Sequence, residues 1–398
     1  MTGRRATKER DFMKHVLFLV SISALGLIGC GSDDSSGSPS SGGASSGGAS
    51  SGGANSGGAN SGGNAGVAGG SAGSSSGGAS SGGASSGGAS SGGASSSGLS
   101  SKYPGDQGID KDPDVVWYEG FEEANVDAVV ARYNDAKKSG LSLDSDVPPK
   151  SSGQKSMKMT ASGSGPNAAD LFKRLDPGYE ELFVRYYAKY QSGVQWHHTG
   201  VWVGGYNPAS NWPSPQAGLK PDGNDRFSVS IEPVGSGANP RLDYYNYWMK
   251  MHSWMDNPSG STAYYGNTLV HDAGFKVDDD QWMCIEIHIK LNPNPGSGAG
   301  AELGVWKNDV SVIQYNDTSP MGYWLKDKFC PDGATSASCT DYPPSSSTPK
   351  VALDLQYRNT AALKLNAFWP QNYITQGGAG SVTYDHMVVA KSRVGCMQ

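Results

Sequence analysis

The segment WMCIEIHIKLN, residues 282–292, alternates apolar and polar side chains along most of its length. Successive side chains of a β-strand point to opposite faces, so an extended segment of this kind has one apolar and one polar face. The apolar face consists of Ile285, Ile287, Ile289 and Leu291, and the polar face of Cys284, Glu286, His288 and Lys290. Such a strand is typical of an antiparallel sheet that covers a core with one face.

Similar short runs recur from residue 115 onward, separated by clusters of Gly, Pro, Asn and Asp. The predicted strands span residues 115–118, 156–159, 182–190, 201–203, 227–232, 242–249, 282–291, 303–306, 353–357, 363–369 and 382–389. One helix is predicted over residues 125–138, from apolar residues at helical spacing. Many short strands without intervening helices predict an all-β fold, an antiparallel β-sandwich of the jelly-roll type.

The first 30 residues are predicted to form a signal peptide. Five basic residues precede an apolar run over residues 16–28, which has the length of a signal-peptide core. The run ends in LIGC, residues 27–30, which resembles the bacterial lipobox, whose cysteine is lipidated. We therefore expect export and a lipid anchor on Cys30, at the bacterial outer membrane or cell surface. An ordinary secretory signal is the alternative.

Residues 31–100 repeat the motif SSGGA with small variations. This sequence has no apolar face to bury and cannot offset the entropy lost when a chain becomes ordered. A disordered Gly/Ser-rich linker is therefore predicted there, followed by one folded domain over residues 101–398. The net charge of −6 does not favour nucleic acid as a partner, and contact with a membrane is expected only through the N-terminal lipid.

The folded domain contains four cysteines, an even number that predicts disulfides in an exported protein. Four cysteines allow three pairings. Proximity in the sequence favours Cys330 with Cys339, which leaves Cys284 with Cys396.

Two adjacent histidines occur in WHHTGVWVGGY, residues 196–206. In an extended strand, neighbouring side chains point to opposite faces, so His197 and His198 are not expected to bind one metal ion together. The same alternation places His198 and Trp202 on one face. Glycines flank Trp202, which would leave a flat aromatic surface suited to a sugar ring, although a core tryptophan packed against close backbone is equally compatible.

Two further predicted strands have a polar or aromatic face opposite an apolar one. In residues 226–233 this face holds Ser228, Ser230 and Glu232. In residues 241–250 it holds Arg241, Asp243, Tyr245 and Tyr247. These residues predict an aromatic, polar groove on one sheet, with Trp202, Trp369 and Tyr373 as stacking surfaces.

The order of these strands resembles the concanavalin A-like jelly roll, through YEGFE (118–122), GQKSMK (153–158), LFVRYY (182–187), residues 282–292 and VTYDHMVVA (382–390). Within that group the chain resembles family 14 type alginate and glucuronan lyases and related uncharacterised secreted bacterial lipoproteins. Arg185-Tyr186-Tyr187 matches their Arg-Tyr-Tyr strand, and Tyr245-Asn246-Tyr247 matches their Tyr-x-Tyr element. His198 stands at the place of a lysine, and Ser228-Val229-Ser230 at that of Ser-x-Arg.

The resemblance implies a lyase that cleaves an acidic polysaccharide, a polyuronide, by β-elimination. This reaction needs a base, an acid and a group that stabilises the developing enolate. His198 is the expected base, Tyr245 or Tyr247 the acid, and Arg241, or else Arg226, the stabilising cation. The substrate would be bound by Trp202, Ser228, Ser230, Glu232 and Trp369.

Two other functions stay open. A lectin-like module would use the same aromatic residues for binding without catalysis. A glycoside hydrolase needs two carboxyl groups across the scissile bond, and Glu232 with Glu286 is the available pair. No cofactor is expected, although Asp278, Asp279, Asp280 and Asp385 could bind a structural calcium ion. The three consecutive aspartates are better explained as a turn before Trp282.

Overall fold

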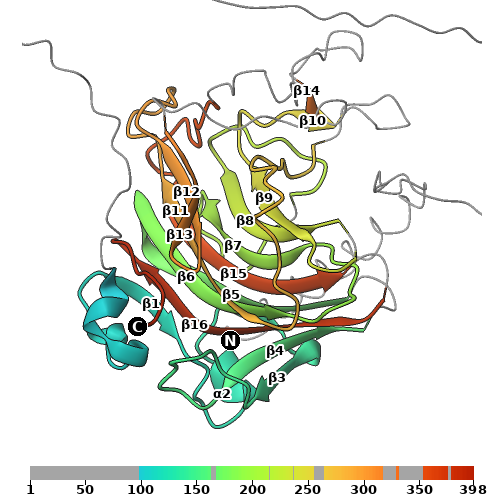
Figure 1. Ribbon diagram of the computed structural model, residues 1–398. Helices are drawn as coiled ribbons and strands as arrows, with labels where there is room; N and C mark the ends of the chain where they lie inside the picture. The colour runs from blue at the N-terminus through green and yellow to red at the C-terminus, as the bar shows by residue number, and fades with distance from the viewer. Residues whose placement is uncertain are drawn as a thin grey trace, which may run out of the picture. The chain divides into compact units, whose positions relative to one another are not determined.

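The computed structural model describes residues 98–162, 167–214, 216–235, 237–254, 264–316, 329–330, 353–374 and 378–398. Two antiparallel sheets form a β-sandwich (Figure 1). The eight-stranded sheet has the order β13-β12-β11-β6-β16-β4-β3, with β1 paired to β16. The six-stranded sheet has the order β2-β5-β15-β7-β8-β9, and β10 and β14 form a separate pair. The predicted all-β antiparallel fold is therefore confirmed.

The bounds of the strands are β1 (Val115–Glu119), β2 (Asp135–Lys137), β3 (Leu141–Asp144), β4 (Ser156–Ala161), β5 (Asn167–Tyr179), β6 (Glu181–Tyr190), β7 (Thr199–Tyr206), β8 (Arg226–Val234), β9 (Arg241–Tyr247), β10 (Ser253–Trp254), β11 (Trp282–Lys290), β12 (Glu302–Lys307), β13 (Val310–Tyr315), β14 (Phe329–Cys330), β15 (Leu365–Ile374) and β16 (Gly380–Ala390). The helical elements of the described residues are α2 (Val126–Val130) and the 3-10 turns Leu99–Lys102, Pro104–Asp106, Ile109–Lys111 and Lys138–Gly140.

The core lies between the two sheets. Ile285, Ile287 and Ile289 of β11 are buried, as are Val229 and Ile231 of β8, and all five belong to one apolar cluster. Full burial of such a side chain contributes about 1.5–3 kcal/mol to folding, so the alternation fixes which face of each strand turns inward.

The helix predicted over residues 125–138 is wrong in its extent. It covers only Val126–Val130, and the side chain of Asn125 caps it by accepting a hydrogen bond from the Ala128 N–H at 2.9 Å. The chain then enters β2, which pairs with β5. Pairing at the sheet edge therefore overrides the helical spacing of the apolar residues.

The strand predicted over residues 353–357 is also wrong. This segment has no regular secondary structure, although Leu353, Leu355 and Tyr357 are buried. Its alternation reflects burial without strand pairing, because the side chain of Asn292 accepts the N–H groups of Tyr357 and Arg358.

Strand β5 has no counterpart among the predictions. It is the longest strand among the described residues, but charged residues and Pro177 interrupt any apolar alternation. Its partner β15 supplies the hydrogen bonds that make it a strand.

A disulfide joins Cys284 of β11 to Cys396 near the C-terminus, with the two Cα atoms 6.0 Å apart. This predicted pairing is confirmed. The other pairing, Cys330 with Cys339, falls outside the residues whose side chains are described.

Residues 1–97 also lie outside the described part of the chain, so the signal peptide, Cys30 and the linker stay predictions. Among the described residues, no helix is long and apolar enough to cross a membrane.

Candidate functional site

A row of side chains crosses the six-stranded sheet on the face that points away from the core. The register pairs Trp369 of β15 with Trp202 of β7, Trp202 with Ser230 of β8, and Ser230 with Tyr245 of β9. Four segments that are far apart in the sequence therefore place side chains in one line. It is the polar, aromatic face predicted from the alternation of residues 201–247, and its use as a binding groove stays a prediction.

The aromatic rings of this row are in mutual contact. The ring centroid of Trp202 lies 5.7 Å from those of both Trp369 and Tyr245. Trp202 itself is only 7% exposed, whereas Trp369 and Tyr245 are half-buried. Trp202 thus supports its neighbours from below, and the surface that a ligand could reach belongs to the flanking rings. A hollow beside this row is lined by Phe172, Trp202, Gly204, Tyr206, Ser228 and Trp369.

The glycines beside Trp202 have a different role from the predicted one. A Cβ atom on Gly200 would lie 2.3 Å from the carbonyl oxygen of Ile231, and one on Gly204 would lie 2.2 Å from that of Phe227. Both positions therefore require glycine because strand β8 approaches closely. These glycines therefore allow β7 and β8 to approach each other, and they do not serve to leave space above Trp202.

His198 does not belong to the extended strand, which begins at Thr199. Its φ angle of 60° places it in the left-handed region, and the rings of His197 and His198 lie side by side with centroids 3.8 Å apart. The prediction that the two side chains point to opposite faces was wrong, because it assumed an extended backbone at His198. In the described part of the chain, no three His, Cys, Asp or Glu residues are grouped as metal ligands would be.

His198 lies at the end of the aromatic row and contacts a buried carboxylate. Its Nδ1 atom is 3.4 Å from Oε2 of Glu232, whose Oε1 accepts a hydrogen bond from Ser230 Oγ at 2.8 Å. An ionised carboxylate only accepts, so this contact favours the tautomer with the proton on Nδ1 and leaves Nε2 with a free lone pair.

Two aromatic rings enclose the exposed side of His198. The ring of Tyr245 lies 4.9 Å away, and that of Tyr373 is stacked at 6.1 Å with an interplanar angle of 16°. Burial, with a further contribution from Tyr247, raises the pKa of Tyr245 well above its ordinary value. Its phenol therefore stays protonated at neutral pH and is a hydrogen-bond and proton donor.

The neighbouring His197 is in a different electrostatic state. Burial, and then the adjacent His198, lower the pKa of His197 to about 3. His197 is consequently neutral at neutral pH and adds no positive charge to the groove.

Three predicted site residues, Ser230 in the row and Ser228 and Tyr247 beside it on the same face, are buried rather than open to a ligand. Tyr247 is 1% exposed, and its hydroxyl lies 3.4 Å from that of Tyr245. Ser230 bonds to Glu232, and Ser228 donates to Oε1 of Gln216 at 2.9 Å. Their hydroxyl groups contact Tyr245, Glu232 and Gln216. Because all three residues are buried, the prediction that they contact the substrate directly does not fit the structure.

The end of the row at Tyr245 is covered by backbone. A Cβ atom on Gly266 would lie 2.4 Å from the ring of Tyr245, so this segment packs directly on the ring. The Gly218 N–H donates to the carbonyl oxygen of Tyr264 at 2.7 Å, which ties the β7–β8 connection to the same segment. The side chains that stay open therefore run from His198 toward Tyr373 and Trp369.

Arg241, predicted to stabilise the reacting carboxylate, forms an ion pair with Asp243 at 3.5 Å. Asp243 is completely buried and also accepts the N–H groups of Leu269, Val270 and His271. The alternative cation, Arg226, pairs with Asp225 at 2.9 Å. Both guanidinium groups thus have carboxylate partners of their own.

The hydrolase pair Glu232 and Glu286 is wrong, because the two residues lie on different sheets. Glu286 belongs to β11 of the eight-stranded sheet, where its carboxylate accepts the N–H groups of Val394 and Gly395 at 2.7 and 2.9 Å. It fastens the C-terminal segment and does not face Glu232.

Sequence reasoning missed two polar residues, Gln371 and Asp170, which lie in the next row of the sheet after the row that contains Trp369. Gln371 of β15 pairs with Gly200 of β7 on one side and with Asp170 of β5 on the other. Asp170 is fully buried, and burial raises its pKa against the opposing charge of Lys137. The alternation of Trp369, Gln371 and Tyr373 could have indicated Gln371, but β5 carries no such signal.

The aspartates considered for calcium have separate protein partners. Asp278 pairs with Lys307 at 2.8 Å, while Asp279 accepts the Asn239 N–H and Asp280 the Ser192 N–H. Asp385 accepts its neighbour's N–H, that of His386. Binding of calcium stays a prediction.

No protein-family model matches the chain, and no curated protein is similar to it in sequence. Solved structures with a similar fold include a variant of alginate lyase Aly36B in complex with an alginate tetrasaccharide, with 9% identity over 70% of this chain and 98% of that one, at a TM-score of 0.45. The PL-14 alginate lyase from Aplysia kurodai has 12% identity over 70% and 99%, at 0.42. Alginate lyase vAL-1 from Chlorella virus has 10% identity over 69% and 100%, at 0.40.

All three are alginate lyases, and the Aplysia enzyme is of family 14. At such distances no activity follows from them, so the activity has to be inferred from the side chains of the groove.

Proposed function

We propose that the protein is a polysaccharide lyase that binds its substrate along the aromatic row and cleaves it by β-elimination at His198. The observation that carries this proposal is the contact between His198 Nδ1 and the buried Glu232, with the ring of Tyr245 at 4.9 Å. A base oriented by a carboxylate and a protonated phenol beside it are the two proton-transfer groups that β-elimination requires.

His198 would remove the proton next to the sugar carboxylate through Nε2. Glu232 holds the ring in the tautomer that leaves this atom unprotonated and stabilises the imidazolium once it forms. Tyr245 would donate its proton to the departing glycosidic oxygen. Tyr247 and Ser230 keep Tyr245 and Glu232 in place through their hydroxyl groups.

Binding would come from the half-buried rings of Trp369 and Tyr373. Aromatic faces suit the apolar faces of sugar rings, whereas Gln371 in the next row is 3% exposed and is not expected to contact the substrate. The proposed substrate is a polyuronide, because an acidic α-proton next to a carboxylate makes this elimination feasible.

The test measures two products after incubation with alginates, glucuronans and neutral glucans. A lyase creates both a new reducing end and an unsaturated end that absorbs ultraviolet light. Replacing His198 by Ala is expected to lower this rate about 10²–10⁴-fold. The matched control is His288→Ala, because His288 lies on the eight-stranded sheet, stacked on Phe183.

A folded His198→Ala variant with the wild-type rate would contradict the assignment of the base. Reducing ends without ultraviolet absorbance would show hydrolysis instead of elimination.

A non-catalytic lectin is the second candidate. It is favoured by the ion pairs of Arg241 and Arg226, which engage the two cations expected to stabilise the reaction. Retention on a polyuronide column without either product would support it.

We also propose that the protein is exported and anchored by a lipid on Cys30. The disulfide between Cys284 and Cys396 supports an oxidising compartment. Cells expressing the full chain and fed a labelled fatty acid should yield labelled protein, and the Cys30→Ala variant should yield none. The control variant Ser32→Ala should keep the label. A Cys30→Ala variant that is still labelled would contradict lipidation of Cys30.

A further inference from the structure

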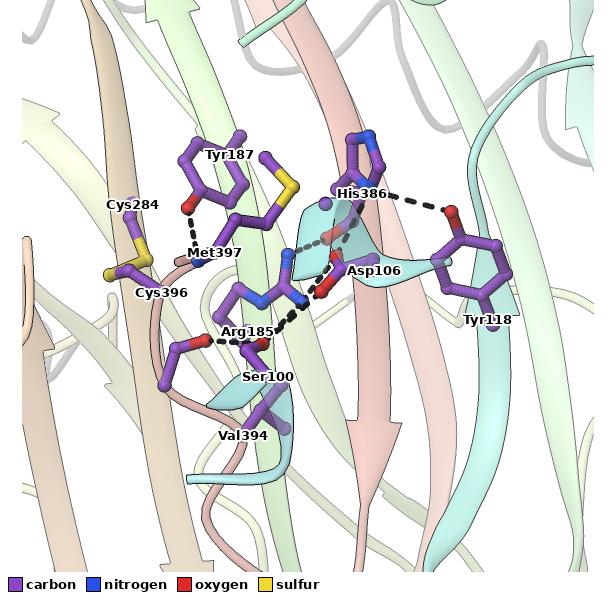
Figure 2. Close-up of polar contacts among 12 residues, drawn as sticks. Ser100, Asp106, Tyr118, Arg185, Tyr187, Cys284, His386, Val394, Cys396 and Met397 are labelled. Atoms are coloured by element: carbon purple, nitrogen blue, oxygen red, sulfur yellow. Dashed lines mark hydrogen bonds and ion pairs between the residues drawn. A yellow bond between two sulfur atoms is a disulfide. The ribbon is translucent and has the colours of Figure 1, made fainter. Parts of the chain in front are cut away.

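A second cluster of chemically reactive groups lies on the eight-stranded sheet, beneath the segment at residues 98–111. Oγ of Ser151 is 2.6 Å from Nε2 of His386, and Nδ1 of the same ring is 3.0 Å from Oδ2 of Asp106. Figure 2 shows Asp106 joined to both His386 and Arg185. A serine, a histidine and a carboxylate are therefore linked in series through the two nitrogens of one imidazole.

Only the serine at the end of this series is partly exposed, as acyl-transfer chemistry needs. Asp106 and His386 are 2% and 1% exposed, whereas Ser151 is half-buried, in the connection between β3 and β4. The carboxylate is thus shielded from water, and the hydroxyl is the member that a solute can approach.

The charges around His386 favour one arrangement of protons. Burial acts to raise the pKa of Asp106, but Arg185 and His386 outweigh it and hold that pKa below its ordinary value. Asp106 is therefore an anion and accepts from Nδ1–H, which leaves Nε2 to accept the proton of Ser151.

The other groups that face this imidazole do not add a second charge. Burial raises the pKa of Asp385, whose Oδ2 lies 3.9 Å from Nε2, well above its ordinary value and so disfavours its charged form. Burial also raises the pKa of Tyr118, whose hydroxyl lies 3.4 Å from Nδ1, and of Tyr187, whose ring lies edge-on to the imidazole.

Three residues of this cluster have left-handed backbone conformations that side chains disfavour. The φ angles are 61° at Asp106, 44° at His386 and 71° at Lys150, immediately before Ser151. Each costs on the order of 1 kcal/mol and persists only where the surrounding structure holds it. Such positions gather at sites where side-chain geometry is functionally constrained.

Gly153 limits the space beside the hydroxyl. Its N–H donates to Ser151 Oγ at 2.9 Å, and a Cβ atom there would lie 3.3 Å from that oxygen and 2.5 Å from Oε1 of Glu122. A side chain at this position would crowd the hydroxyl, so Gly153 leaves the room that a short acyl group needs.

We propose that Ser151, His386 and Asp106 form a second active site, separate from the groove, that hydrolyses esters of short carboxylic acids. Ser151 Oγ would form a bond to the acyl carbon while His386 Nε2 takes its proton, and the ester C–O bond breaks as that proton passes to the departing alcohol. Water then attacks the acyl carbon and gives a proton to His386 Nε2. The bond from that carbon to Ser151 Oγ breaks, the acid leaves, and the proton passes from Nε2 to Oγ, which restores Ser151.

The test uses the full-length protein with a fluorophosphonate probe and with 4-nitrophenyl acetate and octanoate. The probe should label a single peptide that contains Ser151, and the acetate should be hydrolysed faster than the octanoate. Ser151→Ala should abolish labelling and lower acetate hydrolysis at least about a hundredfold. Ser152→Ala is the matched control, because its hydroxyl donates to Gly105 O and not to His386.

His386→Gln should reduce labelling as strongly as Ser151→Ala, with circular dichroism used to confirm folding. Absence of labelling in the folded wild-type protein would overturn the proposal, and so would labelling that survives Ser151→Ala. Neither outcome bears on the proposed lyase activity of the groove, because the fluorophosphonate and the nitrophenyl esters are not polysaccharides.

Discussion

The polar faces of the two sheets differ in what covers them. On the six-stranded sheet, the rings of His198, Tyr245 and Trp369 stay half-buried. On the eight-stranded sheet, Arg185 is fully buried against Asp106, and Glu286 is capped by the N–H groups of Val394 and Gly395. Both faces arise from the same alternation of side chains. Residues 98–111 and the C-terminal segment cover one face, whereas rings on the other face stay half-buried.

The largest effect is expected when the buried ion pair of Arg185 and Asp106, on the covered face, is broken. Arg185→Met should lower the free energy of unfolding by about 3–5 kcal/mol, because Asp106 is left buried without its counter-charge. Urea unfolding followed by tryptophan fluorescence measures this loss.

The matched control is Lys189→Met, also on β6, whose partner Asp146 is exposed. We expect a change within about 1 kcal/mol there. If both variants lose the same free energy of unfolding, the buried Arg185–Asp106 pair stabilises the fold no more than the exposed pair of Lys189 and Asp146.

A smaller effect concerns Glu119 of β1, at the edge of the covered sheet. Burial raises its pKa to about 7, against the opposing charge of Arg132 and with a contribution from Glu123. The unfolded chain titrates near pH 4.3, so between these values the folded state binds more protons and stability falls as pH rises. We expect a loss of about 2 kcal/mol from pH 5 to pH 8.

Unfolding of Glu119→Gln at the two pH values checks this slope. The variant keeps an acceptor for the Phe121 N–H but does not titrate, so the loss should largely vanish. Asp127→Asn, at an exposed pair with Lys138, should keep the wild-type slope. An unchanged slope in Glu119→Gln would contradict the pKa shift.

The smallest expected effect lies on the open face. Trp369→Ala should weaken binding of the polysaccharide about tenfold, corresponding to about 1.4 kcal/mol, through loss of one stacking surface. Affinity electrophoresis in gels that contain the polysaccharide measures this change. Trp212→Ala is the control, because Trp212 is 55% exposed on the β7–β8 connection. Equal effects of both variants would argue against the groove.

Much of the fold followed from local patterns. The alternation of residues 282–291 and 227–232 correctly predicted strands with one buried face, and the face assignments of Trp202, Ser230 and Tyr245 agree with their common row. The missing strand β5 and the shortened helix α2 share one cause. Their conformation depends on pairing between β2, β5 and β15, which no short window of sequence contains.

The site was predicted less completely than the fold. His198 was expected in an extended strand, but its left-handed backbone brings it against His197 and Glu232. Glu232 and Glu286 both lie on the polar face of a predicted strand, but the two strands belong to different sheets, and Glu286 accepts the N–H groups of the C-terminal segment. No local pattern marked Ser151 as a site residue. His386 is 235 positions away from it in the chain and Asp106 is 45 positions away, so no short window of sequence contains all three.

The sequence by itself determined which side chains share a face, because the period of two in a strand is a property of the backbone. The tertiary structure decided which faces meet water and which strands become neighbours. Register and coverage depend on contacts between distant segments, such as Trp369 beside Trp202 and Asp106 beside His386. Both candidate sites of this protein are products of those long-range contacts.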